Sequence, residues 1–402
     1  MAYLKQLAMA ESQYFGNQAN RLDEIQPSGI RKMFARAQGL EGVISLGIGM
    51  PDLMPPQGLL DEVQKSLTSV GSHGYTLNSG IPALQEKIVK KYKEDYDIDF
   101  TNKGVVIGTG GTQILYTTIY AYTNPGDEVV IPDPGFVYYP TIPKMAGCNV
   151  KPVGLNDDFQ IPIDKLTETV SSKTKLMIFN TPNNPCGSIA SEKSVKAIAD
   201  LAQDHNFIVL TDEVYEYIVF DGMKHYPMAK YAPENTITIN SFSKTYCITG
   251  WRLGYGIGND ELIKPLAKLH PFLVANAPSV PQYAIANFMC TDGDYEFRKT
   301  LRDTLQRRRD VIEREFSKIP GVEVPKIRGS FYAFPKVTHD KFSSNNKGYE
   351  FSEEIFEKAK VVTVPSSEFG ETRWDHFRIS FGSADEEKLH EALKKLHIQD
   401  PT

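Results

Sequence analysis

The sequence predicts an α/β protein in which helices cover both faces of a largely parallel sheet, followed by a second, smaller domain. A chain of 402 residues is long enough for about two domains and a large core. Short strand-like runs alternate with helical patterns through the middle of the chain. After about residue 295 the pattern changes to long, charged helices, which indicates the second domain.

The predicted strands are short and almost continuously apolar, and they cover residues 105–107, 129–131, 176–179, 207–210 and 236–239. Between the third and fourth strands, one helical face carries Val195, Ile198, Leu201 and Ala202. Because apolar strands separated by helices are typical of a sheet buried on both faces, we expect these strands to run mostly parallel.

The C-terminal part predicts two long helices. The first carries Leu301, Leu305, Ile312, Phe316 and Ile319 at helical spacing, and we expect its Arg307–Arg309 run to form a solvated face. The last helix opens with Ser383 and Glu386 in a capping-box pattern, and then places Leu389, Ala392, Leu393 and Leu396 on one face.

Composition excludes several classes of protein. Lys and Arg total 44 against 50 Asp and Glu, a net charge of −6 without a broad basic stripe, so we expect no nucleic-acid partner. The chain has no run of about 18 apolar residues and no export signal pattern at its start, so we expect neither a membrane span nor export. The four cysteines form no CxxC pair, which favours reduced thiols in the cytoplasm and no metal site.

Polar and glycine-rich segments follow several of the predicted strands, where open α/β sheets bind ligands. The first is Thr109–Thr112, which contains two glycines and precedes a helical pattern. Backbone N–H groups at such a helix start can bind an anion. A purely structural glycine turn is the alternative.

The second segment, Asn180–Gly187, surrounds an Asn pair with prolines and predicts a rigid turn, which can contain cis peptides. The third, Thr211–Tyr215, places Asp212 at the end of an apolar strand, where a carboxylate needs a cationic or donor partner. Alternatively, the second segment is an ordinary turn and Asp212 caps a helix.

The fourth segment, Ser241–Tyr255, surrounds Lys244 with hydroxyl groups and has Arg252 eight residues further on. This pattern suits either a phosphate site or a desolvated amine nucleophile. A lone lysine is usually a solvated surface residue, so a functional interpretation of Lys244 depends on its neighbours.

These four motifs, in this order, resemble the pyridoxal-phosphate-dependent aminotransferases of fold type I, class I/II, over about residues 44–392. The resemblance implies a large domain, residues 51–295, with a mostly parallel seven-stranded sheet between helices. It also implies a smaller α+β domain formed by residues 1–50 and 296–402.

The resemblance assigns roles to the residues of the motifs. Lys244 is expected to form the Schiff base with pyridoxal phosphate (PLP) and to move the substrate proton, and Asp212 to pair with the pyridine nitrogen. Tyr215 and Asn184 are expected to contact the phenolic oxygen. The expected phosphate ligands are Gly111, Thr112, Ser241, Ser243 and Arg252.

Further matches lie outside the four motifs. Phe136 is expected to stack on the pyridine ring, and Arg378 to bind the substrate α-carboxylate beneath a segment that contains Gly49. Tyr75 matches a tyrosine that reaches the phosphate of the neighbouring subunit, which implies a homodimer with shared active sites.

The implied reaction moves an amino group between an L-amino acid and a 2-oxo acid such as 2-oxoglutarate. The chain has no arginine between Arg252 and Arg298 to read a distal carboxylate, so Lys268, Asn276 or an N-terminal arginine would have to do so. Ile48, Met50, Phe136 and Tyr332 are expected to surround the substrate side chain. An aromatic or broad specificity is therefore at least as well supported as one for aspartate.

Two alternatives remain. A PLP-dependent β-lyase, or an enzyme like aminocyclopropane-carboxylate synthase, shares much of this scaffold and differs in its products. A non-catalytic regulator is the minor alternative, because the residues before Ile44 contain no convincing DNA-binding motif.

Overall fold

The computed structural model describes residues 19–22, 25, 33, 36–37 and 39–397. The start of the chain, which we expect to carry no export signal, and part of the expected 1–50 segment therefore lie outside the described residues.

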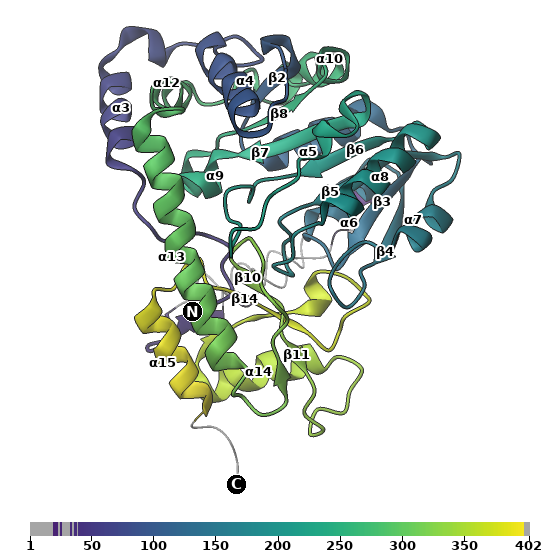
Figure 1. Cartoon of the computed structure of the whole chain (residues 1–402), viewed down its shortest axis with the longest axis vertical. Helices are drawn as coiled ribbons and strands as arrows, with labels where there is room; N and C mark the ends of the chain where they lie inside the picture. Colours follow the sequence, from purple (N-terminus) through teal and green to yellow (C-terminus); the bar gives the residue numbers. More distant parts are fainter. Residues whose placement is uncertain (1–18, 23–24, 26–32, 34–35, 38, 398–402) are drawn as a thin grey trace.

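The centre of the fold is a seven-stranded sheet with the strand order β2-β8-β7-β6-β5-β3-β4 (Figure 1). All strands run in one direction except β8, which is antiparallel to both of its neighbours. The predicted largely parallel sheet is thus confirmed. The strands are β2 (Val105–Gly108), β3 (Glu128–Asp133), β4 (Asn149–Gly154), β5 (Thr174–Asn180), β6 (Ile208–Asp212), β7 (Thr236–Ser241) and β8 (Gly254–Gly258).

Helices cover both faces of this sheet, as the continuous apolar runs predicted. Alternate strand residues point to opposite faces, so Val209 packs in the core under α8 whereas Leu210 packs with α5 and α10. The helices of this part are α3 (Gln57–Thr68), α4 (Pro82–Tyr96), α5 (Gly111–Tyr122), α6 (Tyr138–Met145), α7 (Ile163–Thr169), α8 (Glu192–His205), α9 (Phe242–Thr245), α10 (Asp260–Leu269), α11 (Pro271–Val274) and α12 (Ser279–Phe288).

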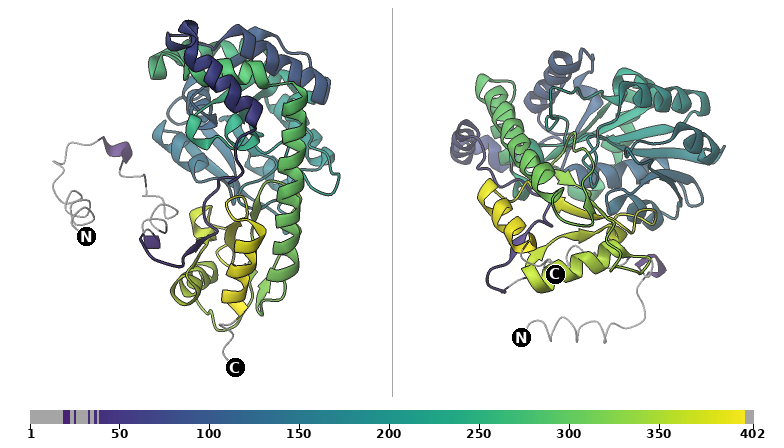
Figure 2. Two further views of the ribbon diagram at one scale, coloured as in Figure 1. Left: turned by 90° about the vertical axis from the view of Figure 1, so that its left-hand side faces the viewer. Right: turned by 60° about the horizontal axis from the view of Figure 1, so that its bottom comes forward.

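The remaining elements form a smaller group of short strands and helices below the sheet in Figure 1. Here β1 lies parallel to β12, so the chain before residue 50 pairs with the C-terminal part. The elements are β1 (Ile44–Ser45), α13 (Asp292–Phe316), β9 (Val322–Glu323), β10 (Tyr332–Ala333), β11 (Lys336–Val337), α14 (Lys347–Ala359), β12 (Val361–Val362), β13 (Val364–Pro365), β14 (Phe377–Ser380) and α15 (Glu386–His397). Figure 2 shows α13 running along both groups of elements.

Two strands of the seven-stranded sheet were not predicted. β4 is an edge strand that contains Pro152 and is mostly polar, so it lacks the apolar run of a buried strand. β8 contains three glycines, and a Cβ on Gly254 would lie 2.8 Å from both Asn240 O and Gly111 N. Glycine is therefore required there by close backbone approach rather than by strand preference.

The capping-box prediction for the last helix is wrong, although its predicted apolar face is buried. α15 starts at Glu386, and the carboxylate of Asp385 accepts the N–H of Lys388 at 2.9 Å. The Ser383 hydroxyl instead lies 3.4 Å from Ile48 O. An acidic N-cap replaces the predicted serine because the helix begins later than the pattern indicated.

The prediction that Arg307–Arg309 forms a solvated face is also wrong for two of the three residues. Arg308 donates to Gly382 O at 2.9 Å and pairs with Asp52 at 2.8 Å. Arg309 is 2% exposed, donates to Ile327 O at 2.7 Å and binds both carboxylate oxygens of Asp221. Successive helical positions point in different directions, so a charge run can have one exposed and two buried members.

We expect Arg309→Ala to lower the free energy of unfolding by about 3 kcal/mol, because it leaves a buried carbonyl and a carboxylate without their cation. Arg307→Ala is the matched control, since the Arg307 side chain is 60% exposed. It should change stability by less than about 0.5 kcal/mol. Urea unfolding of both variants checks this, and equal midpoints would contradict the assigned role of Arg309.

Candidate active site

The predicted polar segments meet at the carboxyl edge of the sheet. Asn180 and Asp212 are register partners at the ends of β5 and β6, and Ser241 ends the adjacent strand β7. They border a cavity of about 310 Å³, a size that suits a small ligand. The lining includes Gly49, Gly111, Thr112, Phe136, Tyr138, Tyr139, Asn180, Asn184, Asp212, Tyr215, Ser241, Ser243, Lys244, Arg252, Tyr332 and Arg378.

Lys244 lies in the short helix α9, whose N-cap Ser241 accepts the N–H of Ser243 at 3.2 Å. The Nζ of Lys244 donates to Gly49 O at 2.5 Å. This hydrogen bond joins the segment that follows β1 to the edge of the sheet. Burial lowers the pKa of Lys244 to about 8, with further lowering by the charges of Arg378 and Arg252 and an opposing contribution from Asp212. This amine is therefore much less basic than an ordinary lysine.

Asp212 faces the cavity with much of its hydrogen-bonding capacity unused. One carboxylate oxygen accepts the Tyr139 hydroxyl at 2.8 Å, and the other lies 3.4 Å from the N–H of Val214. Burial raises the pKa of this carboxyl to about 6, although both hydrogen bonds lower it. A turn rather than a helix follows Asp212, so its alternative interpretation as a helix cap is wrong.

Arg378 lies on β14, in the smaller group of elements, and also lines this cavity. Its Nη1 donates to the Asn184 side chain at 3.0 Å and its Nη2 to Gly47 O at 2.6 Å. The guanidinium carbon lies 4.6 Å from the Tyr332 ring centroid and 4.7 Å from that of Phe369. The Nε is buried and has no hydrogen-bond partner.

An anion site lies beside the start of α5. Gly110 has a φ of +88°, and a Cβ at this position would lie 2.8 Å from Nη2 of Arg252. The absence of a side chain therefore lets the guanidinium lie close to the first N–H groups of the helix. Thr112, Ser241 and Ser243 add aliphatic hydroxyl groups to the lining. A cation, N–H groups and hydroxyls together suit a phosphate dianion.

Every residue predicted to react with or bind PLP, or to bind the substrate α-carboxylate, lines the cavity except Tyr75, which is 91% exposed. Ile48, Met50, Lys268 and Asn276 are not among its lining residues. The sequence interpretation missed Tyr139, which lies in the first turn of α6, three residues after Phe136. Its closeness in the chain to the predicted stacking residue is the signal that could have found it.

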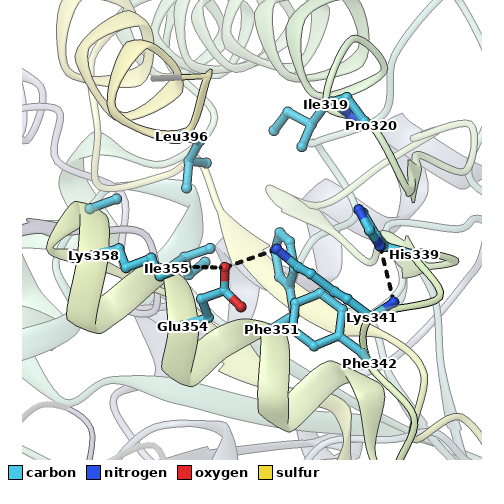
Figure 3. A pocket seen from close by; sticks show the side chains of 11 residues that line it. Ile319, Pro320, His339, Lys341, Phe342, Phe351, Glu354, Ile355, Lys358 and Leu396 are labelled. Carbon is cyan, nitrogen blue, oxygen red and sulfur yellow. Dashed lines mark hydrogen bonds and ion pairs between the residues drawn. The ribbon is translucent and has the colours of Figure 1, made fainter. Parts of the chain in front are cut away.

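A second cavity, of about 50 Å³, lies in the smaller group of elements (Figure 3). Lys341 and Lys358 both donate to Glu354 at its rim, and the rest of its lining is largely apolar. No predicted site residue lines it. The larger cavity at the sheet edge is therefore the candidate active site.

The residues of this larger cavity fit PLP. They offer a weakly basic lysine for its aldehyde, a carboxylate for its pyridine nitrogen, and an anion site for its phosphate. Arg378, which lines the same cavity, would be available to a substrate carboxylate. The sheet and the site together define a PLP-dependent enzyme of fold type I.

Comparisons with known proteins specify the family. The aminotransferase class I and II family matches residues 41–396. An aspartate aminotransferase of Pyrococcus horikoshii is 37% identical over 94% of this chain and 96% of its own length. Aromatic-amino-acid aminotransferase 2 of Thermococcus litoralis is 36% identical over 94% of this chain and 97% of its own.

The structure of aspartate aminotransferase from Thermus thermophilus with maleate superposes with a TM-score of 0.88 at 27% identity, over 95% of this chain and 99% of the other. That of an aromatic aminotransferase from Pyrococcus horikoshii gives 0.84 at 32% identity, over 91% and 98%. The chain belongs to the class I and II aminotransferase family. It is a PLP-dependent amino acid aminotransferase.

In the part of the chain that the structure describes, no helix is both long and apolar enough to cross a membrane. No group of His, Cys, Asp and Glu side chains there could hold a metal ion.

We expect cofactor-free protein to take up PLP at a rate that rises with pH through a midpoint near 8, where the Lys244 amine becomes neutral and nucleophilic. An ordinary lysine would give a midpoint near 10.4. The growth of the visible absorption of bound PLP measures this rate. Lys244→Ala is the control and should give no covalent product, and a wild-type midpoint near 10 would contradict the assigned environment.

Proposed function

We propose that the cavity residues act on PLP as their chemistry suggests, with Lys244 as the covalent attachment point. The observation that carries this proposal is the convergence of Lys244, Asp212 and Arg378 on one cavity. Arg252, Ser241, Ser243, Gly111 and Thr112 would hold the phosphate, and Phe136 would stack on the ring. Tyr215 and Asn184 would donate to the phenolic oxygen.

When bound, PLP supplies an aldehyde that takes up the amino group and a ring that draws electrons from the substrate Cα. Asp212 would hold a proton on the pyridine nitrogen, which favours this withdrawal. Lys244 Nζ, neutral above about pH 8, would accept the proton from Cα and return it during transfer. Because one amine both accepts and returns the proton, the two half-reactions of a ping-pong transfer can share a single site.

Arg378 would fix the substrate by its α-carboxylate. Its Nη groups are held by Asn184 and Gly47, while Nε is buried without a partner. A substrate carboxylate facing the guanidinium in the cavity would gain charge-assisted hydrogen bonds from it. Binding at this end orients the Cα–H bond, and orientation contributes substantially to rate.

We propose an aromatic or broad specificity for the amino donor, with 2-oxoglutarate as an acceptor. The support comes from the residues that would surround the substrate side chain. Within the described lining, the cations are Lys244, Arg252 and Arg378, and each already has a proposed role. Phe136 and Tyr138 add aromatic surface, with ring centroids 4.7 Å apart. The relatives named above include both an aspartate and an aromatic aminotransferase.

We further propose a homodimer in which the partner subunit's Tyr75 reaches the phosphate site. On one protomer Tyr75 is 91% exposed and Phe272 is 83% exposed, and large exposed apolar side chains mark interaction surfaces. The Ser279 hydroxyl donates to Gly74 O at 2.8 Å, which joins the segments that carry these two residues.

The proposed division into a large domain, residues 51–295, and a small domain, residues 1–50 and 296–402, is supported by the hydrophobic clusters. One cluster consists mainly of residues from β1 and from α13 to α15, whereas others lie between the sheet and its helices. We also propose a cytoplasmic location, because all four cysteines are free thiols.

A panel of amino donors with 2-oxoglutarate tests the specificity. We expect phenylalanine and tyrosine to react with a kcat/KM at least equal to that of aspartate. A preference for aspartate of tenfold or more would contradict the proposed pocket. Release of ammonia without amino transfer would instead favour a lyase.

Arg378→Ala serves as the control in the same panel, because all donors share the α-carboxylate. It should cost about 2–5 kcal/mol of transition-state binding for every donor, which lowers kcat/KM roughly 30-fold to several thousand-fold. PLP binding should change little. A cofactor defect with normal substrate affinity would contradict the role of Arg378.

The dimer is tested by the mass of the purified holoenzyme in solution, which should be twice that of the chain. Tyr75→Phe should weaken PLP retention without changing this mass, because only one hydroxyl contact is lost. A monomeric, fully active enzyme would refute shared active sites.

A further inference from the structure

Tyr332 on β10 contacts three different parts of the active site. The sequence suggested only that it contributes apolar surface beside the substrate. In the structure it is 2% exposed and lines the cavity, and β10 pairs with β14, which carries Arg378 (Figure 1). Its hydroxyl and its ring make separate contacts.

The hydroxyl of Tyr332 lies 3.1 Å from that of Tyr215, close enough for a hydrogen bond in which either could donate. Burial raises the pKa of both phenols, so both keep their protons at neutral pH. The charged groups that face this pair are Asp212 and Arg378, and Lys244 lies nearby with its Nζ on Gly49 O. Each phenol has one proton to donate, so the direction of this bond decides where the Tyr215 proton points.

The ring of Tyr332 packs against the Arg378 guanidinium, 4.6 Å from centroid to carbon. Phe369 makes a similar contact at 4.7 Å. Such contacts restrict the orientation of the guanidinium plane, which must align with a carboxylate for a paired interaction.

The position of the Tyr332 hydroxyl depends on Gly49. A Cβ on Gly49 would lie 2.1 Å from the Tyr332 oxygen, so any side chain there would displace the phenol. Gly49 O also accepts the amine of Lys244. The glycine therefore leaves room for the phenol while its carbonyl faces the reactive lysine.

We propose that Tyr332 is a positioning residue with two separable effects, an inference that rests on the function proposed above. Its hydroxyl donates to Tyr215, so that the Tyr215 proton points to the phenolic oxygen of PLP. Its ring orients Arg378 toward the substrate carboxylate. Hydrogen bonds in series strengthen one another, so the first donor affects the contact made by the second.

Two variants of the holoenzyme separate these effects. Tyr332→Phe removes only the hydroxyl, whereas Tyr332→Leu removes both hydroxyl and ring. The first measurement is the pH midpoint of the visible absorption of bound PLP, which reports the proton affinity of the nitrogen that joins it to Lys244. The second is the KM for the amino donor.

We expect Tyr332→Phe to raise the midpoint by about half a pH unit to one unit, because a weaker Tyr215 contact stabilises the deprotonated form less. Its KM should change less than about threefold. Tyr332→Leu should raise the midpoint similarly and also raise KM by about tenfold. A normal midpoint in Tyr332→Phe overturns the hydroxyl effect, and an equal KM in both variants overturns the ring effect.

Tyr215→Phe distinguishes failure of this inference from failure of the proposed function. If Tyr215→Phe raises the midpoint and Tyr332→Phe does not, the inference fails and the role of Tyr215 stands. If neither variant changes the midpoint, both fail. Because Tyr332→Phe is nearly isosteric, the test of the hydroxyl effect does not depend on whether Tyr332→Leu folds.

Discussion

Adjacent parallel strands end at one edge of the sheet, and the active site depends on this alignment. The register pairs Asn180 with Asp212 and Asp212 with Ile239, so the ends of β5, β6 and β7 lie side by side. A segment far away in the chain then completes the site, because β14 carries Arg378 to Asn184. The sheet edge supplies Lys244, Asp212 and the candidate anion site, while the second group of elements supplies Arg378, the proposed ligand of the substrate carboxylate.

A buried polar network lies next to this edge of the sheet. Glu216 accepts hydrogen bonds from Lys91 at 2.5 Å and from Asn240 at 2.6 Å, and Asn240 in turn accepts the N–H of Ser241 at 2.7 Å. The network thus ties the residue after Tyr215 to the residue before Ser241. Fully satisfied buried networks of this kind hold neighbouring side chains in a single arrangement.

Much of the fold and the site was predictable because local chemistry dictated them. The apolar runs identified the buried parallel strands, and the motifs identified the groups that gather around Lys244. Features set by tertiary contact were not predictable. β8 is defined by close backbone approach at Gly254, Arg309 is buried by its bonds to Asp221 and Ile327, and the contact between Tyr332 and Tyr215 joins segments that have no relation in the linear pattern.

The close approach of Gly49 and Tyr332 has an evolutionary consequence. A methyl group at position 49 and a phenol at position 332 compete for the same space, so one can enlarge only where the other shrinks. Substitutions at these two positions are therefore coupled. Among descendants of this sequence, a larger residue at position 49 should occur only together with a smaller one at position 332.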